Sequence, residues 1–98
     1  MENKIGIVVT TGEHKGVFFG YVEKIPNLDE SRTIKLENAR MCVYWPESNH
    51  GVIGLASDGP ADGSKISPPA KEIYLADCNA VFVCSPESSL EWEKNKWK

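Results

Sequence analysis

The sequence lacks any apolar run long enough to cross a membrane, and it has no excess of positive charge. A spanning helix needs about 20 consecutive apolar residues, and the N-terminal stretch MENKIGIVVTTGEH has no basic segment followed by a long apolar one. The net charge is −3, whereas binding to nucleic acid or to an anionic membrane normally needs a basic surface. We therefore expect a soluble protein with no membrane partner, and we disfavour nucleic acid as a partner.

Catalytic and metal-binding patterns are also missing. Neither of the two histidines, His14 and His50, has a cysteine or a second histidine at ligand spacing. Ser64 follows Gly63 but lacks the Gly-x-Ser-x-Gly pattern of an activated nucleophile. Four aspartates occur in turn contexts, where the side chain bonds nearby backbone amides: Asp29, Asp58, Asp62 and Asp77. We expect a protein that is not an enzyme and that uses no metal and no cofactor.

The three cysteines lack the Cys-x-x-Cys spacing of zinc and redox sites. Cys42, Cys78 and Cys84 stand inside apolar, strand-like runs. In such runs a cysteine behaves as a small buried hydrophobe. This pattern predicts reduced thiols and a cytoplasmic protein.

What the sequence does contain is a series of β-branched and aromatic runs that predict strands. Residues 4–11 and 15–24 are two such runs, and a polar loop at 26–31 follows them. Ile34 and Leu36 then alternate with polar residues, but beyond Asn38 the apolar side chains occupy odd positions. That change of register predicts a bulge or tight turn at residues 37–38. The same pattern recurs at 73–83, around Asp77.

Two short helices interrupt or follow these strands. Residues 51–57 fit one or two helical turns, with Ser48 or Asn49 as the cap and Gly59 followed by Pro60 as the stop. A turn at 62–63 and a short edge strand at 65–67 follow, and two prolines limit that strand.

Near the C-terminus, Ser85, Pro86 and Glu87 have the sequence of an N-cap, a first-turn proline and a first-turn acid. They predict a helix over 86–94. Leu90 and Trp92 give this helix a thin apolar face, so we expect it to dock lightly and residues 95–98 to fray.

These elements predict one domain, residues 1–98, that is mainly β with short helices. We expect a small barrel-like or strongly bent antiparallel sheet. Aromatic residues stand on both faces of the strands at 15–24 and 34–45, so both faces need cover. Either the sheet closes into a barrel with the two helices across its outside, or identical subunits pack against each other, and we expect a homo-oligomer.

Several segments resemble a family of small proteins found in phages, prophages and bacterial genomes. The resemblance rests on GVFFGYVE, LENARMCVYW, GLASDGP, GSKISPP and IYLADCNAVFVCS, and it covers about residues 11–92. It implies a small accessory protein of viral origin, acting in the host cytoplasm, for which counteraction of host defence is a reasonable role. No functional residues are transferred by it.

Residues of two segments could form a ligand site. Arginine beside an aromatic suits a phosphate and a flat base, and a glycine-rich turn can present backbone amides to an anion. The candidates are Arg40, Tyr44, Trp45, Gly63, Ser64 and Lys65. The aromatics could equally be packing residues, and the GPADGSK segment a structural turn, because it lacks phosphate-loop spacing and carries two aspartates.

The leading functional hypothesis is therefore a non-enzymatic phage accessory protein that sequesters a small anionic ligand of nucleotide type. The alternative is a protein-interaction or structural module whose aromatic edges bind a host or virion protein. A binder of single-stranded nucleic acid is a third reading, and the net charge of −3 disfavours it.

Overall fold

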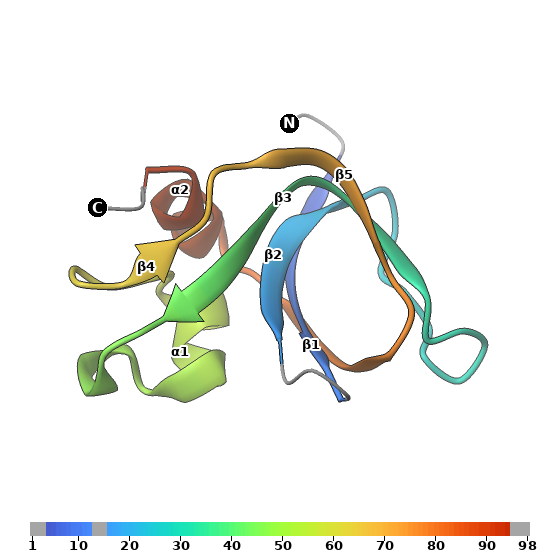
Figure 1. Cartoon of the computed structure of the whole chain (residues 1–98), viewed down its shortest axis with the longest axis horizontal. Coiled ribbons are helices and arrows are strands. Elements are labelled where there is room, and N and C mark those ends of the chain that lie inside the picture. The colour runs from blue at the N-terminus through green and yellow to red at the C-terminus, as the bar shows by residue number, and fades with distance from the viewer. Residues whose placement is uncertain (1–3, 13–15, 95–98) are drawn as a thin grey trace.

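The computed structural model describes residues 4–12 and 16–94, which form a mainly β structure with two α-helices (Figure 1). The elements occur in the order β1 (Ile5–Thr11), β2 (Val17–Val22), β3 (Ile34–Tyr44), the 3-10 turn η1 (Glu47–Asn49), α1 (Gly51–Ser57), β4 (Lys65–Ile66), β5 (Ala70–Leu75), β6 (Cys78–Val83) and α2 (Pro86–Lys94). The predicted mainly β class and the bounds of both helices are confirmed. The expected fraying of 95–98 concerns positions outside the described residues.

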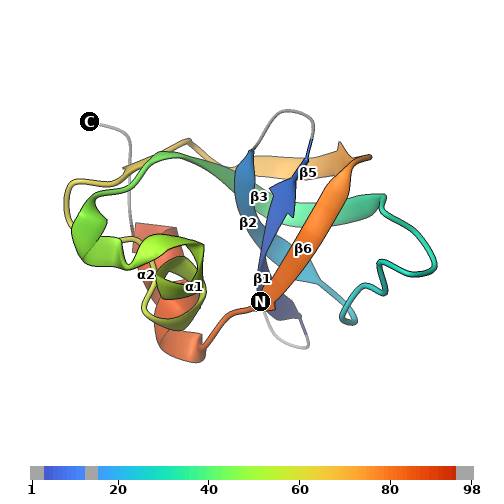
Figure 2. The same cartoon turned by 90° about the horizontal axis from the view of Figure 1, so that it is seen from below.

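All six strands belong to one antiparallel sheet. Its order is β4-β3-β2-β1-β6, and β5 also pairs with β3. The long strand β3 is shared between two partners, because Ile34 pairs with Leu75 of β5 and Cys42 pairs with Ile66 of β4. The chain passes from β5 directly to β6, which lies beside β1 at the other end of the sheet (Figure 2). The sheet is therefore strongly bent and remains open.

The bends occur at the two polar positions that the sequence indicates. Asn38 has a left-handed backbone with φ 49°. The pairing of β2 with β3 shifts register beside it, between the pairs Phe19–Arg40 and Tyr21–Glu37. The second bend separates β5 from β6. The Gly12 N–H there donates to the Asp77 carbonyl at 3.0 Å, and the Cys78 N–H donates to the Arg32 carbonyl at 3.0 Å. The predicted register change is thus confirmed, and backbone bonds hold the second corner in place.

The bent sheet has an apolar cluster on each face. The inner cluster lies in the concave side and contains Ile7, Val9, Val22, Ile34, Leu36, Ala39 and Cys78. The outer cluster contains Val8, Val17, Phe19, Tyr21, Cys42, Leu55, Ala56, Ile66 and Trp92. Helices α1 and α2 supply Leu55, Ala56 and Trp92, so they cover the outer face (Figure 1). Because the chain covers this face itself, two apolar faces no longer argue for a second subunit.

The prediction that the C-terminal helix docks lightly is wrong. Trp92 is completely buried and stacks on Phe19, with the ring centroids 5.0 Å apart and the planes 8° from parallel. Its indole N–H donates to the Leu55 carbonyl at 3.2 Å, and the Ser88 hydroxyl donates to the same oxygen at 2.6 Å. Leu90, in contrast, is 57 % exposed. A serine and a tryptophan, rather than two apolar residues, form the buried side of α2.

The caps of the helices are partly as predicted. The Ser88 N–H donates to the Ser85 hydroxyl at 3.0 Å, which confirms Ser85 as the cap of α2. The N-cap position of α1 is not Ser48 or Asn49, as predicted, but His50. His50 has φ 60° and makes no side-chain capping bond. Gly59, with φ 84°, follows the end of α1 as expected. Among the described residues no helix has the length and apolar character that crossing a membrane requires.

Candidate functional site

The end of β3 and the short strand β4 form a two-stranded extension of the sheet, which we call the β3–β4 arm. It consists of residues 41–44 and 65–66. Cys42 pairs with Ile66 and Tyr44 pairs with Lys65. Ser67 adds two bonds to Met41, since its N–H donates to the Met41 carbonyl and its hydroxyl accepts from the Met41 N–H, both at 2.9 Å. In Figure 1 the arm projects from the bent part of the sheet, with α1 below it. Its backbone is thus held from both strands.

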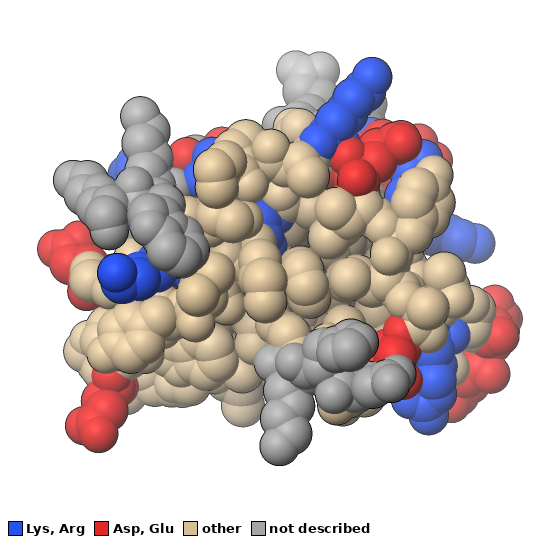
Figure 3. All heavy atoms as spheres, in the orientation of Figure 1, with Lys and Arg blue, Asp and Glu red and all other residues tan. Residues whose placement is uncertain are grey.

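The arm has one buried side and one exposed side. Cys42 and Ile66 are 3 % and 0 % exposed and belong to the outer apolar cluster. Met41, Val43 and Tyr44 are 38, 48 and 52 % exposed. In the space-filling view, uncharged atoms occupy the middle of the molecular face seen in Figure 1, and most charged side chains lie toward its rim (Figure 3). The arm therefore presents three large apolar or aromatic side chains to the solvent.

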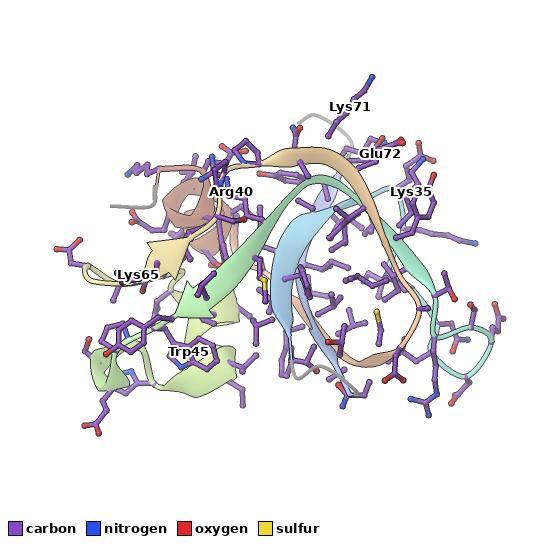
Figure 4. All side chains as sticks on the ribbon, in the orientation of Figure 1. Lys35, Arg40, Trp45, Lys65, Lys71 and Glu72 are labelled. Atoms are coloured by element: carbon purple, nitrogen blue, oxygen red, sulfur yellow. The ribbon has the colours of Figure 1, made fainter. Side chains whose placement is uncertain are left out.

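Five of the six predicted ligand residues lie in the arm or next to it. Tyr44 and Lys65 are direct cross-strand partners. Trp45 follows β3 and is half-buried against the outer cluster, toward α1 (Figure 4). Gly63 has φ 94° with open space around it, in a turn closed by the Ser64 N–H and the Ala61 carbonyl at 3.1 Å. Ser64 itself is 8 % exposed. Exposed Tyr44 and Lys65 are the two members that a ligand could reach together.

The sixth residue, Arg40, lies away from the arm, beside α2. It pairs with Phe19 across β2 and β3, and its Nη2–H donates to the Glu93 carbonyl of α2 at 3.4 Å. With Tyr21, Asn38, Pro69, Phe19 and Glu93 it lines a concavity of about 170 Å³. None of the other five candidates lines that concavity. The structure therefore divides the predicted set into an arm group and an arginine that faces α2 (Figure 4).

Tyr21 and Glu93 form a polar contact that sequence reasoning missed. The Tyr21 hydroxyl donates to Glu93 Oε1 at 2.5 Å. Burial, followed by this hydrogen bond, raises the pKa of Tyr21 well above its ordinary value of 10.0. Tyr21 therefore remains a neutral donor at physiological pH and is unsuited to act as a base. The two residues meet only because α2 folds back over β2, and no local sequence signal marks such a pair.

Two further concavities are open and lined by mixed groups. One, of about 410 Å³, lies between α2 and the sheet; the other, of about 330 Å³, lies beside the start of β3. Lys4 lines both, and its ammonium is 2.6 Å from Glu37 and 3.1 Å from Glu23. The bond to Lys4 lowers the pKa of Glu37. Because the positive and negative side chains neutralise one another, neither concavity offers a binding site with a charge of one sign.

Groups for metal binding or covalent chemistry do not gather in the part of the chain that the structure describes. Across residues 4–12 and 16–94, no three histidine, cysteine or acidic side chains converge on a point that could hold a metal ion. Burial raises the pKa of the Cys42 and Cys84 thiols to about 11, so both stay protonated and poorly nucleophilic at neutral pH. His50 lies at the start of α1, and His14 lies outside the described residues.

The fold and the surface define a class of small, mainly β domains with a bent, open sheet. In this class two helices cover the outer face of the sheet, and an exposed apolar arm lies at its edge. The chain belongs to the family described as a domain of unknown function (DUF6948), whose model matches residues 5–92. The match includes all six strands and most of α2. Comparison with curated proteins gave no match, and comparison with solved structures gave none.

Proposed function

We propose that this chain is a non-enzymatic binding protein that holds a partner protein on the exposed side of the β3–β4 arm. One observation carries the proposal: Met41, Val43 and Tyr44 are 38, 48 and 52 % exposed within four consecutive residues of one strand. Contiguous exposed apolar groups on a small protein commonly mark an interaction site. Methionine and tyrosine are also enriched at protein interfaces.

The construction of the arm suits such a role. Its opposite side is anchored by Cys42 and Ile66 in the outer cluster, and its backbone is paired along both strands. A surface that is already ordered loses little conformational freedom on binding. The apolar side chains would form the dry centre of an interface, and exposed Lys65, across from Tyr44, would contribute to its polar rim.

The resemblance to small phage and prophage proteins supports a particular setting for this activity. In that setting the chain is an accessory protein of viral origin that acts in the host cytoplasm. The partner is then a host or virion protein, and occupation of a host-defence protein by the arm would counter that defence. No step of chemistry is required, since occlusion of a surface is sufficient.

The experiment compares three tagged forms of the chain as baits in cells that produce the partner. Wild type is compared with Val43→Lys, and Tyr74→Lys is the matched control because Tyr74 is 67 % exposed but lies on β5. We expect one stoichiometric partner with wild type and with Tyr74→Lys, and loss of that partner with Val43→Lys. Equal recovery with all three baits would contradict the proposal.

A second candidate function is supported by the pairing of Tyr44 with Lys65. An exposed aromatic ring can stack on a base while a nearby ammonium meets a phosphate, so this pair would hold a small nucleotide that the protein sequesters. Calorimetry with nucleotides and cyclic dinucleotides tests this candidate. Binding heat that is lost in Tyr44→Ala but kept in Tyr74→Ala would favour it, and absence of heat with wild type would refute it.

A further inference from the structure

Three strands of the sheet have an outer edge, and they differ in how that edge is protected. Unpaired edges invite other strands, so proteins usually make them short or place charges and prolines on them. Strand β4 has two residues, Lys65 and Ile66, and two prolines follow shortly after it. Strand β5 carries Lys71 and Glu72, and the Glu72 carboxylate is 3.3 Å from the Lys35 ammonium (Figure 4). Both edges therefore have a recognised protective feature.

The edge of β6 has none of these features. Its sequence is CNAVFV, and residues 78–85 include no charge and no proline. Within residues 4–12 and 16–94, no strand pairs with the side of β6 that faces away from β1 (Figure 2). Val83, at its end, is 52 % exposed. Cys78, at the start of the strand, is already bonded to Arg32, whose carbonyl accepts from the Cys78 N–H at 3.0 Å and whose guanidinium donates to the Cys78 carbonyl at 3.4 Å. The remaining uncharged edge, residues 79–83, is a template for strand addition.

The pairing with β1 determines which backbone groups of β6 are free to bond. The Cys84 N–H donates to the Gly6 carbonyl at 2.9 Å, and Val8 stands opposite Phe82. Antiparallel strands alternate between residues that bond to the partner and residues that point away. Ala80 and Phe82 therefore bond toward β1, whereas the N–H and C=O groups of Val81 and Val83 point outward.

We propose that β6 pairs with β6 of a second copy of this chain, which makes one continuous sheet across a two-fold dimer. An antiparallel register in which Val81 faces Val83 of the second copy uses all outward groups of both residues, giving about four backbone hydrogen bonds. The same register places Phe82 beside its own copy on the outer face, where aromatic cross-strand pairs are favourable.

The charge pattern identifies a second copy as the occupant. In a two-fold interface each residue near the axis meets its own copy or a close neighbour, so a charged strand brings like charges together. The uncharged strand β6 avoids that repulsion, while symmetric pairing of β5 would bring Lys71 and Glu72 to the interface. The dimer edge is separate from the β3–β4 arm, so this proposal does not rest on the proposed function.

Sedimentation of the purified chain tests the dimer. We expect wild type at twice the monomer mass, and Val83→Pro at the monomer mass, because proline removes an outward N–H without touching the bonds to β1. Val83→Thr keeps the N–H and the branched shape and should remain dimeric. A monomeric wild type at every concentration, or a dimeric Val83→Pro, would overturn the proposal.

Amide exchange of the wild-type chain is the second measurement, and it does not depend on how Val83→Pro folds. The N–H groups of Val81 and Val83 should be protected at high concentration and should exchange faster on dilution below the dimer range. If they exchange rapidly under conditions where the protein is dimeric, the dimer uses another surface and the proposal is wrong.

Discussion

Replacement of Trp92 tests whether α2 is part of the core. The side chain is 0 % exposed, and it stacks on Phe19. Truncation of such a residue to alanine costs about 3–5 kcal/mol. Domains of this size are stable by about 5–15 kcal/mol, so Trp92→Ala should remove about a fifth or more of the free energy of unfolding. At about 4–8 °C per kcal/mol, the melting temperature should fall by at least about 12 °C.

Two companion variants separate packing from other causes. Trp92→Phe keeps a ring against Phe19 but loses the indole bond to Leu55, whose carbonyl still accepts from the Ser88 hydroxyl at 2.6 Å. We expect it to cost about 1–2 kcal/mol. Leu90→Ala, at a side chain 57 % exposed, should change stability by less than about 0.5 kcal/mol. Urea unfolding followed by circular dichroism measures all three. The reasoning is refuted if Leu90→Ala costs as much as Trp92→Ala.

Three further predictions concern a tyrosine, the thiols and the glycines. Burial raises the pKa of Tyr21 above its ordinary value of 10.0. The contribution of Tyr21 to stability should therefore be complete below pH 10 and should decrease as the pH rises above 10. Absorbance titration at high pH should show one tyrosine that ionises only on unfolding, and ionisation of all tyrosines in the native chain near pH 10 would contradict the prediction. Cys42 and Cys84 have pKa values raised to about 11, so both should react slowly with a thiol reagent at pH 8 and rapidly in denaturant. Fast labelling of both thiols in the native chain would argue against their burial. Gly59→Ala should destabilise the protein more than Gly63→Ala, although both glycines have positive φ. The reason is steric, because a Cβ on Gly59 would stand 2.5 Å from the Glu91 Cβ, while Gly63 has open space around it. Thermal unfolding compares the two variants, and equal decreases in melting temperature would disprove the steric cause.

The strands and their bends could be predicted because the relevant signals are local. The change of apolar positions around Asn38 and the repeat at Asp77 indicate where the sheet bends, and Ser85 followed by Pro86 identifies the start of α2. These features depend on backbone geometry within a few residues. Local sequence therefore contains enough information to predict them.

The packing of α2 could not be predicted in the same way. Ser88 is completely buried, yet serine counts as polar in a sequence pattern, and its hydroxyl is satisfied by a distant carbonyl of α1. Gly6 permits the close approach, since a Cβ there would collide with the Ser89 side chain. A pattern that counts apolar residues misses small residues that allow a helix to approach a sheet closely.

Which of the candidate site residues lie close together could be predicted only in part. Tyr44 and Lys65 meet because two neighbouring strands pair, which the strand prediction allows. Arg40 is bonded to the end of α2 instead, and that contact depends on how the helix returns across the sheet. The exposed side of the arm is visible only once Cys42 and Ile66 are known to face the helices.

Site-specific photo-crosslinking in living cells tests the proposed role of the β3–β4 arm most directly. A photoreactive amino acid at position 43 stands on the exposed side of the arm, and the same group at position 74 stands on β5, where the native side chain is 67 % exposed. The account predicts a discrete heteromeric product, formed with one protein partner, from position 43 and none from position 74. The absence of a product at position 43, or equal products at both positions, would contradict it.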